Sequence, residues 1–188
     1  MEVFAFFASI PVDDLGQKLA AGIDLLNHEV RSAVDRGKLR ILERYHRIAM
    51  VGLSSNPFRP SHFAAIYMIA EGYDVIPVNP REKEVLGRRS YPSLREVPGP
   101  IEIVDIFREA SAVPGIVEEA IACNAKVVWM QLGVIHEEAA ALARAAGLDV
   151  VMDRCVKIEH ARFFGGLTKI GLNTGVISAR KRNHSSGR

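Results

Sequence analysis

The chain has 188 residues, of which 48% are hydrophobic and 24% are charged, and its formal net charge is +2. A chain of this length and composition suits one soluble domain that folds without disulfide bonds or structural metal. The near-neutral charge gives no reason to expect nucleic acid as a partner, and two cysteines, Cys123 and Cys155, make no disulfide framework.

The first 46 residues are expected to form a helical extension. Apolar residues recur every three or four positions from residue 12 to 46, with an interruption near Gly37. The opening segment carries Glu2 in place of a basic stretch and has only a short apolar run, which argues against a signal peptide. No stretch reaches the roughly 18 apolar residues of a membrane span. We therefore expect a cytoplasmic protein with no membrane partner.

Residues 47–177 predict an α/β domain in which short apolar strands alternate with helices. Strands are expected at 48–51, 73–78, 101–107, 126–131 and 148–152. Helices are expected at 62–71, 113–123, 136–146 and 154–164. Right-handed crossovers would arrange five such strands as a Rossmann-like, doubly wound parallel sheet.

Individual residues predict where helices begin and end and how the chain continues after the last helix. Ser61 is expected to be the N-cap of the first of these helices, and Gly72 is expected to end it. Pro114 suits the first turn of the next helix, where its missing N–H costs little. The glycine-rich segment 165–177 predicts a strand or loop, and the basic residues 178–188 predict a flexible tail.

Polar residues follow the first strand, and ligands bind beyond the carboxyl ends of the strands in doubly wound sheets. Gly52 would let backbone amides approach an anion, and Ser54, Ser55 and Ser61 carry hydroxyl donors for phosphate oxygens. Arg59 adds a positive charge. Because the loop matches neither GxGxxG nor a Walker A motif, two interpretations stay open: a pyrophosphate site, or a loop that caps its own helix.

The second strand is followed by Asn79, Pro80, Arg81, Glu82 and Lys83. An NAD site usually has an acidic residue directly after this strand to hold the ribose hydroxyls. Arg81 and Lys83 instead suit a phosphate on the ribose, which both NADP and coenzyme A carry. The alternative is that both are solvated loop charges.

The next two strand ends carry further candidates. Phe107 or its apolar neighbours would flank an adenine ring, and Arg108 would reach a phosphate. Asp105 also fits a purely structural role, as a cap or in an ion pair with Arg108. Gln131 and Gly133 offer a polar side chain and a closely approachable backbone.

Cys155 follows the fifth strand at a helix start with basic neighbours, which predicts a lowered thiol pKa. Cys155 and His160 are five residues apart and so face different sides of a straight helix, which argues against a catalytic pair. Cys123 is expected to be a packing residue and His136 a helix-terminus residue. The spacing of cysteines and histidines fits no metal site.

The strand-end motifs together resemble the stand-alone CoA-binding proteins, which are related to the CoA-binding domain of the succinyl-CoA synthetase α subunit. The motifs are IAMVGLSSNPFRPS, GYDVIPVNPR, EIVDIFR, VVWMQLGV and VVMDRCVKIEHAR, and with the closing GLNTGVIS they cover roughly residues 38–181. The resemblance implies a Rossmann-type fold with coenzyme A as ligand. It also implies roles: the pyrophosphate at Gly52, Ser54, Arg59 and Ser61; the ribose and 3′-phosphate at Asn79, Pro80 and Arg81; the adenine and its linkage at Val104, Asp105, Phe107 and Arg108; and the pantetheine arm at Gln131 and Gly133, with its thiol near Cys155.

Three functional hypotheses follow. In the first, the protein binds coenzyme A or an acyl-CoA without ligase activity of its own, because the chain lacks the synthetase's second domain with its phosphorylated histidine. In this hypothesis Cys155 is placed to form a mixed disulfide with the CoA thiol. The second is an NADP-dependent oxidoreductase. The third is a CoA-binding subunit of a larger ligase complex, with the helical extension as a docking surface for a partner or a second copy.

Overall fold

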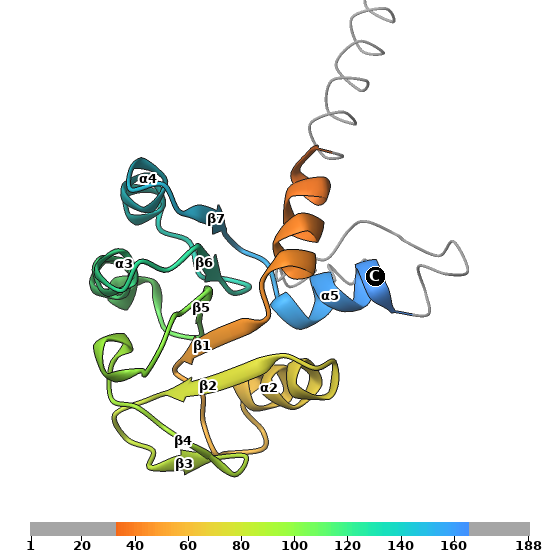
Figure 1. Ribbon diagram of the computed structural model, residues 1–188, viewed down its shortest axis with the longest axis vertical. Coiled ribbons are helices and arrows are strands. Elements are labelled where there is room, and N and C mark those ends of the chain that lie inside the picture. Colours follow the sequence, from red (N-terminus) through yellow and green to blue (C-terminus); the bar gives the residue numbers. More distant parts are fainter. Residues whose placement is uncertain (1–32, 166–188) are drawn as a thin grey trace, which may run out of the picture. The chain divides into compact units, whose positions relative to one another are not determined.

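The computed structural model describes residues 33–165 (Figure 1). The chain divides into two compact units, and the boundary between them in the sequence lies between Arg40 and Ile41. Residues 33–44 are helical without a break at Gly37, so the expected interruption there is wrong. A glycine in a helix interior costs only about 1 kcal/mol relative to alanine, which the rest of a helix can offset. The expectations for 1–32, for the glycine-rich segment beyond 165 and for the tail lie outside the described residues.

The second unit is built on a sheet of five parallel strands in the spatial order β2-β1-β5-β6-β7 (Figure 1). The strands are β1 (Arg47–Val51), β2 (Asp74–Val78), β5 (Ile103–Ile106), β6 (Val127–Met130) and β7 (Asp149–Val151). The register pairs Val51 with Val78 on one side and with Ile106 on the other, so these three strands end at one level. The expected Rossmann-like sheet is confirmed, with strand bounds shifted by at most two residues.

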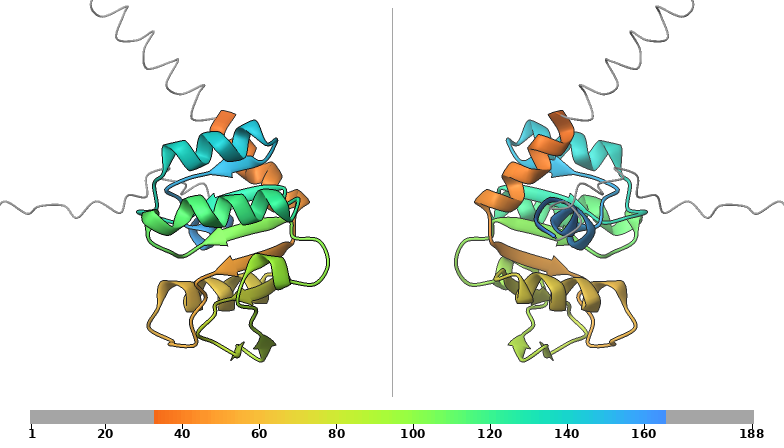
Figure 2. Two further views of the ribbon diagram at one scale, coloured as in Figure 1. Left: turned by 90° about the vertical axis from the view of Figure 1, so that its left-hand side faces the viewer. Right: turned by 90° about the vertical axis from the view of Figure 1, so that its right-hand side faces the viewer.

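Helices cover both faces of the sheet (Figures 1 and 2). They are α2 (Pro60–Ala70), α3 (Val113–Ala122), α4 (Glu137–Ala145) and α5 (Val156–Phe164). One buried cluster joins α3 and α4 to strand residues such as Ala49, and a second joins α2 and α5 to residues such as Ile48 and Met50. Because both faces are buried, the strands have continuous apolar sequences.

The helix ends correct one expectation and confirm three. Helix α2 begins at Pro60 with Arg59 as its N-cap, so Ser61 lies inside the first turn and is not the cap. Proline takes this first position because its fixed φ suits the helix and its missing N–H costs nothing there. Gly72 follows the C-cap of α2 with φ +91°. Pro114 lies in the first turn of α3, and the ring of His136 caps α4 by accepting from the amide of Ala139 at 3.2 Å.

A short hairpin between β2 and β5 was not expected from the sequence. Strands β3 (Glu84–Val85) and β4 (Arg88–Arg89) pair antiparallel through a turn in which Leu86 and Gly87 both have positive φ. Two-residue strands are too short to show an alternating pattern, and Leu-Gly is not one of the dipeptides that mark such turns. Two 3-10 turns, Leu94–Glu96 and Ala110–Ala112, are equally short.

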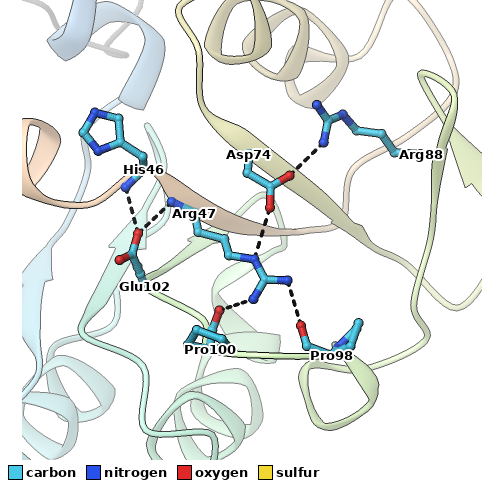
Figure 3. Close-up of polar contacts among 7 residues, drawn as sticks. All are labelled: His46, Arg47, Asp74, Arg88, Pro98, Pro100 and Glu102. Carbon is cyan, nitrogen blue, oxygen red and sulfur yellow. Dashed lines mark hydrogen bonds and ion pairs between the residues drawn. The ribbon is translucent and has the colours of Figure 1, made fainter.

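The amino-terminal edge of the sheet is held by Arg47 (Figure 3). Its guanidinium group pairs with the carboxylate of Asp74 at 3.1 Å and donates to the carbonyl oxygens of Pro98, at 2.7 Å, and Pro100. One side chain at the start of β1 therefore binds the start of β2 and the segment that leads into β5. Asp74 also accepts from Arg88 at 2.8 Å.

Glu102 completes this edge. One of its carboxylate oxygens accepts from the backbone amides of His46 and Arg47, both at 2.8 Å (Figure 3). These contacts lie at the edge opposite the loops on which the candidate site is built. Within residues 33–165, no helix is long and apolar enough to cross a membrane.

Candidate functional site

The strand order places a candidate site at the carboxyl ends of β1 and β5. β1 lies between β2 and β5. The chain therefore passes from β1 to β2 at one edge of the sheet and later crosses back past β1 to form β5. The first connection runs over one face of the sheet through α2, and the second runs over the other face past Leu94. In doubly wound sheets, ligands bind between the loops that follow two such strands. These loops contain residues 52–59 and 107–112.

Gly52 allows these two loops to approach closely. It has φ +88°, and a Cβ atom at this position would lie 2.6 Å from the carbonyl oxygen of Phe107 and 2.8 Å from the Arg108 side chain. The Gly52 amide donates to Val78 at 2.8 Å. The absence of a side chain at Gly52 therefore lets the backbone after β1 pass close to the backbone after β5. The N–H of Gly52 itself is bonded to the end of β2.

The loop after Gly52 is held by its own side chains. The Ser54 hydroxyl accepts from the Asn56 amide at 3.2 Å, and the Asn56 side chain accepts from the Phe58 amide at 2.9 Å. The buried Ser61 hydroxyl accepts from the Ser54 amide at 3.3 Å, and the His62 ring lies 2.9 Å from the Ser54 carbonyl oxygen. Such side-chain to backbone bonds set the loop shape before any ligand arrives.

This loop leads into the amino-terminal end of α2, where backbone amides and the helix dipole favour anions. No acidic residue lies in the first turn of α2, and Arg59 is exposed beside it. Pro60 has no N–H, and the amides of His62 and Phe63 donate to the Arg59 carbonyl oxygen at 3.0 Å and 3.4 Å. What this position offers an anion is therefore the helix dipole and the charge of Arg59.

A carboxylate binds Ser55 in this loop. The Ser55 amide and hydroxyl donate to the same oxygen of Glu82, at 3.0 Å and 2.9 Å. These bonds, that of the amide first, hold the pKa of the Glu82 carboxyl below its ordinary value. The sequence interpretation gave Glu82 no role, although one acidic residue between Arg81 and Lys83 was a visible signal.

Asn79 joins the loops after β1 and β2. It is buried, its side chain donates to the Leu53 carbonyl oxygen at 2.9 Å, and it accepts from the Arg81 amide at 3.1 Å. The side chains of Arg81 and Lys83 are exposed, and neither makes a hydrogen bond or ion pair with any residue of the described range. Both cations are therefore available beside the Ser54 loop.

Asp105 lies at the end of β5 and is fully buried. One carboxyl oxygen accepts from the Gln131 side chain at 2.6 Å, and the other has no partner among residues 33–165. Burial raises the pKa of Asp105 to about 7, and the bond from Gln131 opposes this rise. Asp105 neither caps a helix nor pairs with Arg108, so the structural roles expected for it are wrong.

Cys155 is the N-cap residue of α5. Burial raises the pKa of its thiol above the ordinary value, although the amides of Ile158 and Lys157 act in the opposite direction. The lowered thiol pKa expected from its basic neighbours is therefore wrong, because desolvation outweighs the helix amides. His160 lies 3.0 Å from the Tyr67 hydroxyl.

The other predicted positions lie at the same edge, with one exception. Phe107 and Arg108 are half-buried after β5, and Gly133, with φ +79°, follows β6 and donates its amide to Asp153 at 2.8 Å. Pro80 is exposed after β2. Val104 is the exception, because it lies within β5 and is fully buried in the core. No group of three or more potential metal ligands is found in the described part of the chain.

Comparison with known proteins shows which family this domain resembles. Residues 46–161 match the family described as the CoA binding domain. The chain belongs to this family. The CoA binding domain spans all five strands and every predicted site residue, and the resemblance found in the strand-end motifs is confirmed.

Individual relatives resemble this chain over most of their own length. The YneT protein of Bacillus subtilis (strain 168) is 46% identical over 121 residues, which cover 64% of this chain and 90% of YneT. A structure from Pyrococcus horikoshii OT3 is 44% identical with a TM-score of 0.68, covering 70% of this chain and 92% of that one. A structure from Thermus thermophilus is 36% identical with a TM-score of 0.67, covering 69% and 98%.

Proposed function

We propose that this protein binds coenzyme A or an acyl-CoA at the carboxyl ends of its strands and has no ligase activity of its own. The observation that carries the proposal is the loop 53–59 at the start of α2, held beside the exposed cations of Arg81 and Lys83 at the switch point of a CoA binding domain. Coenzyme A carries a pyrophosphate and a 3′-phosphate, which suit these two neighbouring groups.

The residues would divide the ligand between them. The pyrophosphate would lie against Ser54, Ser55 and Arg59, near the amino-terminal end of α2. The 3′-phosphate would lie at Arg81, with Lys83 beside it. This division places the two anionic parts of the ligand on the loops that Asn79 ties together.

The rest of the ligand would follow the carboxyl edge of the sheet. The adenine would lie by Phe107 and Arg108, and the pantetheine arm would run past Gln131 and Gly133 toward Cys155. The bound coenzyme would supply a thiol or thioester at that end.

Binding without ligase chemistry is supported by the state of the nucleophilic side chains. The raised pKa of the Cys155 thiol keeps it protonated near neutral pH, and the ring of His160 is held by Tyr67. Neither side chain is arranged as an activated nucleophile.

The alternative ligand is NADP, because Arg81 and Lys83 suit a 2′-phosphate as well as a 3′-phosphate. Calorimetry with coenzyme A, dephospho-CoA and NADP separates these ligands. We expect coenzyme A to bind at least about tenfold more tightly than dephospho-CoA, which is about 1.4 kcal/mol. Binding of NADP with no heat from coenzyme A would reject the proposal.

Variants then assign the phosphate. We expect Arg81→Ala to weaken coenzyme A binding by about tenfold and to leave dephospho-CoA binding unchanged, because only the 3′-phosphate is lost from recognition. Arg95→Ala is the matched control, since Arg95 is an exposed arginine on the turn Leu94–Glu96. Equal losses in both variants would show a general charge effect.

A further inference from the structure

The contact between Glu82 and Ser55 lies inside the candidate phosphate loop. Ser55 is exposed, and its amide and hydroxyl converge on one carboxylate oxygen at 3.0 Å and 2.9 Å. Convergent N–H and O–H donors are what a phosphate oxygen requires. In the ligand-free protein, an anion of the chain itself therefore fills this donor pair.

The contact joins two loops that are distant in sequence. Glu82 follows β2, and its backbone amide donates to Asn79 at 3.2 Å, so the turn that carries it is fixed independently of its side chain. A rotation of the Glu82 side chain alone would free both donors of Ser55. The hydrogen bonds that Ser54, Asn56 and Ser61 make within the loop are separate from the two Ser55 bonds, although the Ser54 side chain also helps to lower the pKa of Glu82.

The charges around Glu82 give its carboxylate an effect on ligand affinity. Arg81 and Lys83 flank it in the sequence and are exposed. A phosphate ligand gains from both cations but must displace the carboxylate from Ser55 and bear its negative charge nearby.

We propose that Glu82 is an internal competitor for the phosphate-binding donors of Ser55, and that it lowers the affinity of this loop for anions. This inference rests on the proposed function, because it concerns the same loop. It assigns Glu82 as an affinity-determining residue of the site.

Calorimetry of Glu82→Gln and Glu84→Gln tests the inference. The first variant keeps the side-chain shape and removes the competing charge. The second removes the same charge from an exposed residue two positions away, on β3. We expect Glu82→Gln to raise the affinity for coenzyme A and for dephospho-CoA by the same factor, about threefold to fivefold, as for other exposed charge contacts. We expect Glu84→Gln to change neither affinity by as much as about twofold.

Two results would overturn the inference. Weaker binding by Glu82→Gln would show that the carboxylate organises the loop for the ligand. An equal gain in both variants would show a general effect of charge, with no role for the contact to Ser55.

A second probe keeps this test separate from the proposed function. If coenzyme A binds none of the proteins, the proposed function fails, and titration with inorganic pyrophosphate still decides the role of Glu82. Tighter pyrophosphate binding by Glu82→Gln than by wild type and Glu84→Gln supports internal competition. Equal or weaker binding rejects it.

Discussion

Asp105 is a carboxyl group in an environment that disfavours its charge. It is fully buried, Gln131 satisfies one oxygen, and the other has no partner in the described range. Moving a charged carboxylate out of water without full compensation is costly, so the group holds its proton to higher pH. The pKa of about 7 follows from this burial.

This shift predicts how stability varies with pH. The pKa of Asp105 rises from 3.8 to about 7 on folding, so between these values the folded state holds a proton that the unfolded state has lost. Stability from this group is therefore complete below about pH 4 and falls as pH rises toward 7. We expect the melting temperature of Asp105→Asn, measured without ligand, to be higher relative to that of wild type at pH 8 than at pH 5. Asp149→Asn, at an exposed position, is the control, and equal pH profiles for wild type and Asp105→Asn would contradict the argument.

The thiol of Cys155 gives a second prediction. Because burial raises its pKa, little thiolate forms near neutral pH. In a Cys123→Ser background, we expect iodoacetamide to alkylate Cys155 more slowly at pH 7.5 than in the same protein unfolded in urea, as followed by mass spectrometry. A folded protein that reacts as fast as the unfolded one would show an activated thiol.

Gly52 predicts a sharp difference between two glycine substitutions. An alanine at Gly52 would have φ +88° and a Cβ atom 2.6 Å from the Phe107 carbonyl oxygen, whereas a Cβ atom at Gly115 meets nothing within 4 Å. We expect Gly52→Ala to lower the free energy of unfolding by about 2 kcal/mol or more. Gly115→Ala should be neutral or stabilising by up to about 1 kcal/mol, since Gly115 lies in α3. Urea denaturation measures both, and a harmless Gly52→Ala would mean that the two loops separate easily.

At the scale of elements, sequence patterns predicted most of the sheet and its helices. Continuous apolar runs marked the strands, because both faces of the sheet are covered. The start of α2 differs from the prediction: the sequence pattern indicates Ser61 as the N-cap, whereas the helix begins at Pro60 and the Ser61 hydroxyl accepts from the Ser54 amide in the preceding loop. The hairpin β3–β4 was missed because its strands have two residues each.

The sequence predicts at which edge of the sheet the candidate residues lie, but it does not predict the hydrogen bonds between them. Strand ends located the residues, since parallel strands end at one edge. The bonds from Gln131 to Asp105 and from Ser55 to Glu82 join residues 26 and 27 positions apart. No local pattern reports such pairs, and burial, which sets the pKa of Asp105 and Cys155, depends on the whole packed core.

Glu102 predicts how the start of β1 is stabilised. Its carboxylate accepts from the amides of His46 and Arg47, each at 2.8 Å. We expect Glu102→Ala to lower the free energy of unfolding by about 1–2 kcal/mol, because both amides lose a charged acceptor. Glu102→Gln should recover part of this loss, since an amide oxygen still accepts. Thermal unfolding compares the two, and equal losses would show that hydrogen bonding to the amides is unimportant.

At the scale of the molecule, the two edges of the sheet are held by different residues. Arg47 and Glu102 hold the amino edge, while the candidate ligand groups lie at the carboxyl edge. A strand of five residues separates these edges by about 17 Å, beyond the range at which substitutions usually interact.

Because of this separation, we expect substitutions at the amino edge to change stability without changing ligand affinity. We expect Arg47→Ala to lower the melting temperature and leave the dissociation constant for coenzyme A unchanged within about twofold. At about 100 times the dissociation constant, coenzyme A should stabilise wild type and variant equally, by about 2.7 kcal/mol. Scanning calorimetry with and without ligand measures both, and a smaller ligand effect in the variant would reveal coupling across the sheet.

The Arg47 contacts also matter for how this protein can change over generations. A scaffold secured at one edge tolerates substitutions at the other, since altered loops need not weaken the bonds that keep the strands together. New ligand preferences can then be sought by randomising residues 55–59, 80–83 and 108–109 in a library, with Arg47, Asp74, Glu102 and the buried Leu53 and Asn79 left as they are. Most variants from such a library should remain folded, so that a selection would distinguish them by ligand affinity and not by stability.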